Sequence, residues 1–326
     1  MNAIEMKSLT KYYGKTLGAK DINLTIPSGS FYGFIGPNGA GKSTTLRMLM
    51  NIIFPTSGEG TILGKNIVTN ALDIKHFVGY LPSSINLYKE LKVFQLIKQS
   101  LEYYQHTSWL DESIAQDWQD CIYKLTPLKR KEMMNTKVNY LVDTLQLDVN
   151  KKIADLSFGN TKKMGIILSM IHSPKILILD EPTGGLDPLM QDKYFDLLKE
   201  QHDLGCTIFF SSHILSEVEK VCDKVAIIKN GEIIRDEGVE HLKQNNLKKV
   251  AIWVNQSHIN SLLTSFNLTV NSQSLTINKV NNTTSKISFN YSGKVNDLVK
   301  KLAKYSITNL TVTEPTLEDI FKHYYE

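Results

Sequence analysis

The feature that most constrains this chain is a glycine-rich loop between an apolar run and a helical pattern. Its residues fit the pattern GxxxxGK[ST] and are Gly36, Pro37, Asn38, Gly39, Ala40, Gly41, Lys42 and Ser43. Residues 31–35 before the loop are apolar, and residues 44–50 after it have helical spacing. Glycines let backbone N–H groups turn inward around an anion, and a helix N-terminus adds positive potential. The sequence therefore predicts a phosphate-binding loop for a nucleoside triphosphate, between a strand and a helix.

Four side chains have predicted roles at this phosphate site. Lys42 would reach the β- and γ-phosphates, and Ser43 would ligate Mg²⁺. Residues 176–179 form a second apolar run, which ends in Asp180 and Glu181. Ligands of open α/β sheets lie at the carboxyl ends of the strands, so both carboxylates are expected to face the nucleotide. Asp180 is suited to hold Mg²⁺ through water, and Glu181 is suited to act as the general base that polarises the attacking water.

A helix is predicted to begin between these two motifs. Residues 156–160 read Leu-Ser-Phe-Gly-Asn, and a helical stretch follows as far as His172. Ser157 is expected to be the N-cap of this helix. The helix start would then present backbone N–H groups and a hydroxyl to an anion.

The order of these motifs resembles that of the nucleotide-binding subunits of ATP-binding cassette (ABC) transporters. Residues 156–160 are similar to the family signature, usually Leu-Ser-Gly-Gly-Gln. Residues 184–187, which end in Asp187, resemble the D-loop of the family. Asp187 and Pro188 also predict a helix start, with an acidic N-cap and proline at the first helical position. His213 follows a predicted strand and resembles the switch histidine, and Tyr13 resembles the aromatic residue that stacks on adenine.

The resemblance covers about residues 1–240 and implies how ATP is bound and hydrolysed. Tyr13, the phosphate loop and Thr44 would bind ATP, and His213 would orient the γ-phosphate and the water that Glu181 activates. The signature would act in a head-to-tail dimer with C₂ symmetry, where it closes over the ATP on the other subunit. The residues with this role in trans are Ser157, Gly159 and Asn160.

Two motifs depart from the family pattern. The Q-loop usually carries a glutamine after a strand, and this chain has Ser83 there, which is too short to reach Mg²⁺ as a carboxamide does. A bridging water could substitute. In the signature, Phe158 and Asn160 replace the usual Gly and Gln, and we interpret Phe158 as a packing or subfamily variation. Such signatures resemble those of ABC-2 type bacterial exporters of drugs, antibiotics and small peptides.

Composition and charge point away from a membrane-spanning or nucleic-acid-binding chain. The 326 residues carry a net charge of +4 and no block of like charge. The 3 cysteines lack metal spacing, and with no signal sequence they favour a reducing compartment. No apolar run approaches the roughly 18 residues that span a bilayer. The resemblance therefore implies a separate integral membrane permease, a second ATP-binding subunit, no nucleic acid, and a peripheral location on the cytoplasmic face of the membrane.

The predicted fold class is α/β, with a P-loop NTPase cassette at residues 1–240 and a small accessory α/β domain at residues 241–326. The cassette is expected to contain a helical subdomain at about residues 90–172. Period-2 alternation and glycine turns predict an antiparallel edge sheet at residues 4–6, 21–26 and 60–63. Apolar runs predict a mainly parallel core sheet at residues 31–35, 176–179, 207–210 and 225–228. The order of elements in the second domain predicts a ferredoxin-like sandwich.

The helical subdomain is predicted to be longer than is usual for the family, with the extra length at residues 109–130. Helical spacing upstream of this segment is carried by Phe94, Ile97, Leu101 and Tyr104. Trp109 and Trp118 favour core packing over contact with a partner, because amphipathic helices usually bury such a stripe internally.

The predicted function is an ATP-hydrolysing subunit that energises export, and two alternatives stay open. One is a catalytically impaired half of a heterodimeric transporter, which only Ser83 and the altered signature favour. The other is a soluble ABC ATPase that acts on ribosomes, DNA or cofactor assembly. Such proteins usually carry two cassettes or long coiled coils, and this chain has one phosphate loop and no sustained heptads.

Overall fold

The computed structural model describes residues 2–105, 126–244, 247–266, 275–281 and 283–314. The chain divides into two compact units, Met1–Glu237 and Gly238–Glu326, which are described separately below. Within the described ranges, none of the helices combines the length and the apolar character needed to traverse a bilayer.

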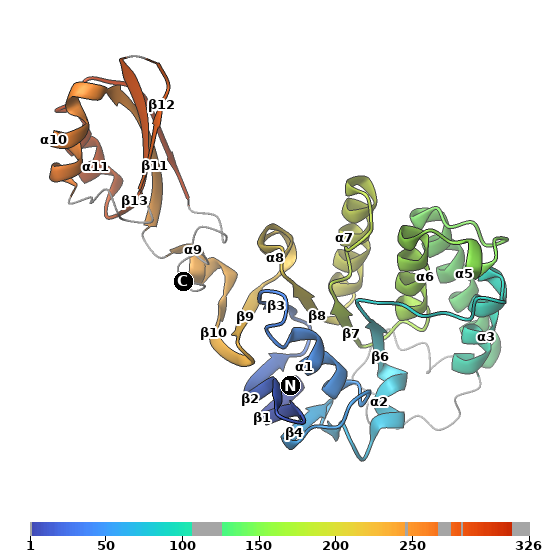
Figure 1. Ribbon diagram of the computed structural model, residues 1–326. Helices are drawn as coiled ribbons and strands as arrows, with labels where there is room; N and C mark the ends of the chain where they lie inside the picture. Colours follow the sequence, from blue (N-terminus) through green and yellow to red (C-terminus); the bar gives the residue numbers. More distant parts are fainter. Residues whose placement is uncertain (1, 106–125, 245–246, 267–274, 282, 315–326) are drawn as a thin grey trace. The chain divides into compact units, whose positions relative to one another are not determined.

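A six-stranded sheet with the order β10-β9-β3-β8-β7-β6 forms the centre of the first unit (Figure 1). Its strands are β3 (Phe31–Ile35), β6 (Val78–Leu81), β7 (Ile176–Asp180), β8 (Thr207–Ser212), β9 (Lys224–Lys229) and β10 (Glu232–Gly238). The pairs β3–β8, β3–β9, β7–β8 and β6–β7 are parallel. Every residue of β3, β7 and β8 is buried, as expected for strands covered on both faces. The predicted parallel core sheet is therefore confirmed.

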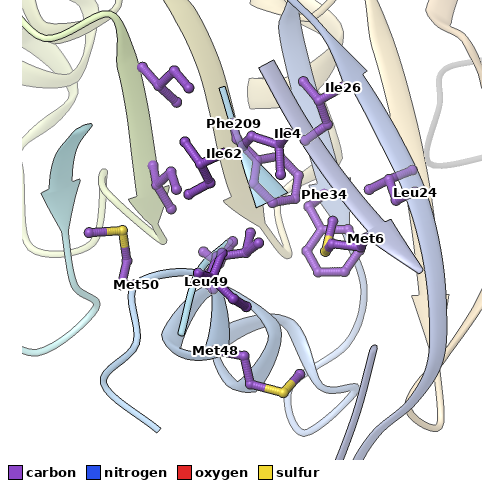
Figure 2. Packing of buried hydrophobic residues seen from close by; sticks show 14 of the residues in the cluster. Ile4, Met6, Leu24, Ile26, Phe34, Met48, Leu49, Met50, Ile62 and Phe209 are labelled. Carbon is purple, nitrogen blue, oxygen red and sulfur yellow. The ribbon is translucent and has the colours of Figure 1, made fainter. Parts of the chain in front are cut away.

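A second sheet of the first unit is antiparallel, with the order β2-β1-β4-β5. Its strands are β1 (Asn2–Tyr13), β2 (Thr16–Pro27), β4 (Ser57–Ile62) and β5 (Lys65–Asn66). Its apolar face, the core sheet and helix α1 (Lys42–Leu49) share one buried cluster, in which Ile4, Phe34 and Leu49 are each at most 1% exposed. Figure 2 shows these side chains packed together. This packing fixes α1, and with it the preceding loop, against both sheets.

The remaining helices of the first unit include a group of three that pack on one another, namely α3, α5 and α6 (Figure 1). Besides α1, the described helices of the first unit are α2 (Ala71–Phe77), α3 (Val93–Gln105), α5 (Pro127–Leu145), the 3-10 helix η2 (Ile153–Asp155), α6 (Phe158–Met170), α7 (Pro188–Asp203) and α8 (Leu215–Val221). In α3, Ile97 and Leu101 are buried, whereas Phe94 is 43% exposed. Trp109 and Trp118 lie outside the described residues.

The second unit has its own four-stranded sheet, with the order β12-β13-β11-β14 and antiparallel pairs. Its elements are α9 (Val239–Gln244), β11 (Leu247–Asn255), the 3-10 helix η3 (Gln256–His258), α10 (Ile259–Ser265), β12 (Thr276–Lys279), β13 (Thr284–Ser292), α11 (Val295–Leu302) and β14 (Ile307–Thr313). The second unit has a hydrophobic core of its own, which includes Ile252, Phe289 and Leu298. From β11 onward the order β-α-β-β-α-β is the one that ferredoxin-like folds have, and assignment to that fold stays a prediction.

Candidate functional site

Four segments with predicted functional residues follow neighbouring parallel strands of the core sheet. The phosphate loop follows β3, Ser83 follows β6, Glu181 follows β7, and His213 follows β8. The carboxyl ends of these strands lie at one edge, because Asp180 pairs with Ser211 in the parallel register of β7 and β8. This edge is where α/β sheets bind ligands.

The backbone of the phosphate loop is closely surrounded. Gly41 has φ +109° and precedes the first residue of α1. A Cβ added to Gly41 would lie 2.6 Å from the carbonyl oxygen of Gly18, and one added to Gly36 would lie 2.5 Å from that of Ile228. Both contacts are with backbone, which cannot move aside, so only glycine suits these two positions. The loop therefore keeps the path that lets its N–H groups surround an anion.

The ammonium of Lys42 lies inside this loop. Its side chain is 4% exposed, and its Nζ donates to the carbonyl oxygens of Gly36 at 2.6 Å and Pro37 at 3.2 Å. The same Nζ lies 3.4 Å from Oε1 of Glu181. A buried cation at the N-terminus of a helix is a suitable group to bind phosphate oxygens.

The carboxylate of Asp180 is fully buried and only partly satisfied. Its Oδ1 accepts hydrogen bonds from Ser43 Oγ at 3.0 Å and Ser211 Oγ at 2.8 Å. Its Oδ2 has no hydrogen-bond partner among the described residues. A buried carboxylate oxygen left in this state is costly, and a hydrated divalent cation would satisfy it. The residues present therefore suit Mg²⁺.

Glu181 lies between two groups that can carry positive charge. Its Oε1 is 3.4 Å from Lys42 Nζ and 3.2 Å from His213 Nδ1. Its backbone has φ +46°, an uncommon conformation for a residue with a side chain, and its N–H donates to the carbonyl oxygen of Ser211 at 3.1 Å. Residues held in such conformations cluster at functional sites.

Tyr13 lies beside the start of α1 and is 46% exposed as a residue. A Cβ added to Gly18 would lie 2.8 Å from the Tyr13 ring and 3.0 Å from Cγ2 of Thr44, so Gly18 separates these two side chains. Lys11 Nζ lies 5.5 Å from the centre of the ring. An accessible aromatic face next to the phosphate loop could stack on a planar base.

The signature residues occupy the N-terminus of α6, as predicted. Ser157 Oγ accepts a hydrogen bond from the backbone N–H of Asn160 at 3.3 Å, which makes Ser157 the N-cap. A Cβ added to Gly159 would lie 2.7 Å from the carbonyl oxygen of Gly185, so the signature touches the predicted D-loop of the same chain. Within the described chain, no hydrogen bond joins Ser157 or Asn160 to the phosphate loop.

Phe158 and Asp187 have local structural roles in this region. Phe158 is 67% exposed as a residue, yet one edge of its ring lies against Gly185, where an added Cβ would be 2.3 Å from the ring. Asp187 Oδ1 accepts from the backbone N–H of Met190 at 3.0 Å and caps α7, and Pro188 follows at the first helical position. Both features of this helix start were predicted from the sequence.

Two residues at the site were missed by sequence reasoning, Ser211 and Lys162. Ser211 bridges the two carboxylate residues, because its Oγ donates to Asp180 and also accepts from the Glu181 N–H at 3.2 Å. Lys162 is 2% exposed, and its Nζ lies 3.4 Å from the carbonyl oxygen of Pro82 and 3.5 Å from that of Ser83. Burial lowers the pKa of the Lys162 ammonium to about 8, although the charges of Asp180 and Glu181 raise it.

Comparisons with known proteins agree with this geometry. The family described as ABC transporter matches residues 19–184. The bacitracin transport ATP-binding protein BcrA of Bacillus licheniformis is 30% identical over 98% of this chain and 95% of its own length. A solved ATP-binding subunit of an ABC transporter has a TM-score of 0.63 at 24% identity, over 74% of this chain and 92% of that one. A solved dimeric bacterial ABC transporter cassette has a TM-score of 0.60 at 24% identity, over 72% of this chain and 98% of that one. The chain therefore belongs to the ABC transporter family, as an ATP-binding subunit with ATPase activity.

Proposed function

We propose that this ATPase subunit energises the export of a drug, antibiotic or small peptide through a separate membrane permease. The observation that carries the proposal is the extent of the similarity to the bacitracin transport protein. That similarity spans 98% of the chain and so includes the second unit, Gly238–Glu326, whereas the solved cassettes cover 72% to 74%. A chain of this kind would lie on the cytoplasmic face of the membrane, held there by the permease.

The phosphate loop would hold the triphosphate of ATP, with Tyr13 on the adenine. Lys42 would exchange its contacts with the loop carbonyls for contacts with the β- and γ-phosphates, which are the stronger acceptors. Ser43 and Asp180 would hold Mg²⁺, which when bound would neutralise charge on the phosphates. Support comes from Oδ2 of Asp180, which has no hydrogen-bond partner among the described residues and could accept from a water that hydrates the metal.

Glu181 would act as the general base for the water that attacks the γ-phosphate. The contact of its carboxylate with Lys42 would break as Lys42 turns to the phosphates, which frees the carboxylate to accept a hydrogen bond from water. His213, 3.2 Å away and 45% exposed, would orient that water and the γ-phosphate. The positive φ of Glu181 and its N–H bond to β8 hold the carboxylate at the edge of the sheet.

A second ATP-binding subunit would complete each site. In the part of the chain that the structure describes, Ser157, Gly159 and Asn160 make no hydrogen bond to the phosphate loop of their own chain, so this helix start, where Ser157 is exposed, is available to the ATP on another subunit. The dimeric cassette among the solved structures is a precedent for this arrangement in the family. Two such contacts related by C₂ symmetry would let ATP hold the dimer closed until hydrolysis releases it.

A catalytically impaired half of a heterodimer is the alternative with an observation in its favour. Ser83 stands where the family pattern has a glutamine, and Phe158 alters the signature. Against it, Oε1 of Glu181 lies 3.4 Å from Lys42 Nζ and 3.2 Å from His213 Nδ1, a grouping that supports an active subunit. An active subunit therefore accounts for more of the site than an inert one.

The proposal is tested by capture of partners from membranes of the native organism. A tagged Glu181→Gln chain with Mg-ATP should retain a polytopic membrane protein, and a matched Lys42→Ala/Glu181→Gln chain should retain much less. Capture of ribosomes or nucleic acid without a membrane protein would overturn the transport function and leave the ATPase.

A further inference from the structure

Lys162 is unusual because a full-length cationic side chain is buried where helix α6 meets the end of β6. It lies on the second turn of α6 and is 2% exposed, whereas its neighbour Lys163 is partly exposed. Its Nζ reaches two backbone carbonyls, those of Pro82 and Ser83, at 3.4 Å and 3.5 Å. These are long contacts for a charged donor, so they compensate only part of the desolvation of the ammonium.

The face of α6 that carries Lys162 is held closely against the segment around Ser83. Gly165, three residues along the helix and therefore on the same face, lies so near this segment that an added Cβ would be 2.3 Å from Cδ1 of Ile85 and 2.8 Å from Cδ1 of Leu81. A displacement of this segment would therefore displace α6 with it.

The ammonium of Lys162 also lies next to the catalytic edge. Leu81 pairs with Leu179 in the parallel register of β6 and β7, so Pro82, whose carbonyl Lys162 contacts, stands beside Asp180. Desolvation lowers its pKa, while the charges of Asp180 and Glu181 act in the opposite direction and favour the charged form. Lys162 is thus a cation on the signature helix that is attracted by the two carboxylates of the same chain.

We propose that Lys162 is a positioning residue that couples the nucleotide state of the chain's own site to its signature helix α6. The inference rests on the proposed function, in which α6 closes over the ATP on a second subunit. Lys162 would also replace the link that a Q-loop glutamine would provide between the nucleotide site and the helical region, because its ammonium contacts the backbone carbonyl of Ser83.

The coupling follows from the change in charge during the reaction cycle. Bound ATP adds negative charge at the sheet edge and strengthens the attraction on the ammonium, and release of phosphate and ADP removes it. Since the ammonium is anchored on α6, part of this change in attraction acts on the position of α6. By linkage, a contact that holds α6 in its closed position must also favour ATP in the chain's own site.

Hydrogen–deuterium exchange on the full chain tests this coupling. The parent would be the Glu181→Gln chain, which keeps ATP intact, at a concentration where sedimentation shows single subunits. Peptides that cover residues 36–43 report nucleotide binding, and peptides that cover residues 158–170 report α6. In the parent, Mg-ATP should slow exchange in both. With Lys162→Met added and Mg-ATP at a saturating concentration, the loop should keep its ATP-dependent protection, and the protection of α6 should fall by about tenfold.

Lys163→Met is the matched control, because it removes a neighbouring ammonium from the same helix and should leave both effects of ATP unchanged. If Lys162→Met does not fold, Lys162→Gln is the second variant, since its amide can donate to both carbonyls but carries no charge. Full ATP-dependent protection of α6 in either variant would overturn the proposal, as would the absence of any effect of ATP on α6 in the parent. Loss of protection at residues 36–43 in the parent would instead contradict the proposed function.

Discussion

The phosphate end of the site and its linking end are built in different ways. At the phosphate end, Lys42, Asp180, Glu181 and His213 each stand next to the end of a core strand or the start of α1, and contacts of 3.4 Å or less join them to one another or to Ser43. At the linking end, which comprises Ser83, Phe158 and Lys162, the Lys162 side chain of α6 reaches the carbonyls of the segment after β6, and Phe158 lies against Gly185. The family pattern is kept at the first end and altered at the second. We infer that the groups proposed to perform the chemistry depend on the edge of the sheet, whereas the groups proposed to transmit it can be exchanged for others that make a similar contact.

The largest effect is expected at the phosphate end. Lys42→Ala removes the ammonium from the loop and should weaken ATP binding by about a hundredfold, since a hydrogen bond to a charged group contributes up to about 3 kcal/mol. Equilibrium titration with a fluorescent ATP analogue measures this. Lys15→Ala, which removes an exposed lysine, is the control. An unchanged dissociation constant for Lys42→Ala would show that the loop does not bind phosphate.

Ser211→Ala should have the next largest effect, on turnover rather than on binding. Its hydroxyl contacts both Asp180 and the N–H of Glu181, so its loss should lower kcat by about tenfold and leave the affinity for ATP nearly unchanged. Ser30→Ala, at the opposite end of the strands, is the matched control. A wild-type kcat for Ser211→Ala would show that the Ser211 hydroxyl does not contribute to turnover.

Lys162 should give the stability of the chain a distinctive pH dependence. Burial lowers its pKa from 10.5 to about 8, so above about pH 8 the unfolded chain binds a proton that the folded chain has lost. The free energy of unfolding then rises with pH. Between about pH 7 and pH 9 it should increase by about 1 kcal/mol more in the wild type than in Lys162→Met. Urea denaturation at several pH values measures the difference, with Lys163→Met as the reference that should show no such gain. A constant difference across this range would mean that Lys162 is solvated.

The smallest effect is expected at the cap of α7. Asp187→Ala removes the side chain that accepts from the Met190 N–H and should lower the free energy of unfolding by about 1 kcal/mol or less. Asp187→Asn keeps a capping oxygen and should lose only a few tenths. If both variants are as stable as the wild type, the cap contributes nothing and Asp187 must be explained by dimer contacts alone.

The phosphate end could be predicted from the sequence because its residues are fixed by local patterns. A glycine pattern before a helix predicted Lys42 and Ser43 as site residues, and an apolar strand that ends in two acidic residues predicted Asp180 and Glu181. The helix starts at Ser157 and Asp187 were predicted for the same reason, since a cap depends on residues three positions away.

Ser211 and Lys162 could not be predicted because their partners are distant in sequence. Ser211 contacts Asp180 only through the register of β7 and β8, which no local pattern specifies. Lys162 stands among polar residues in the first turns of α6, a pattern typical of an exposed face, and only the packing of Gly165 on Ile85 brings that face inside. Phe94 is the opposite case, an apolar residue at helical spacing that the structure leaves half exposed.

The most direct test of the account is ATP turnover by Glu181→Gln, measured with the amount of nucleotide that stays bound. The account predicts that this variant binds Mg-ATP as the wild type does, hydrolyses it at least about a hundredfold more slowly, and retains the uncleaved nucleotide in a dimer. Turnover at the wild-type rate would show that Glu181 is not the base and would contradict the mechanism built on the edge of the core sheet.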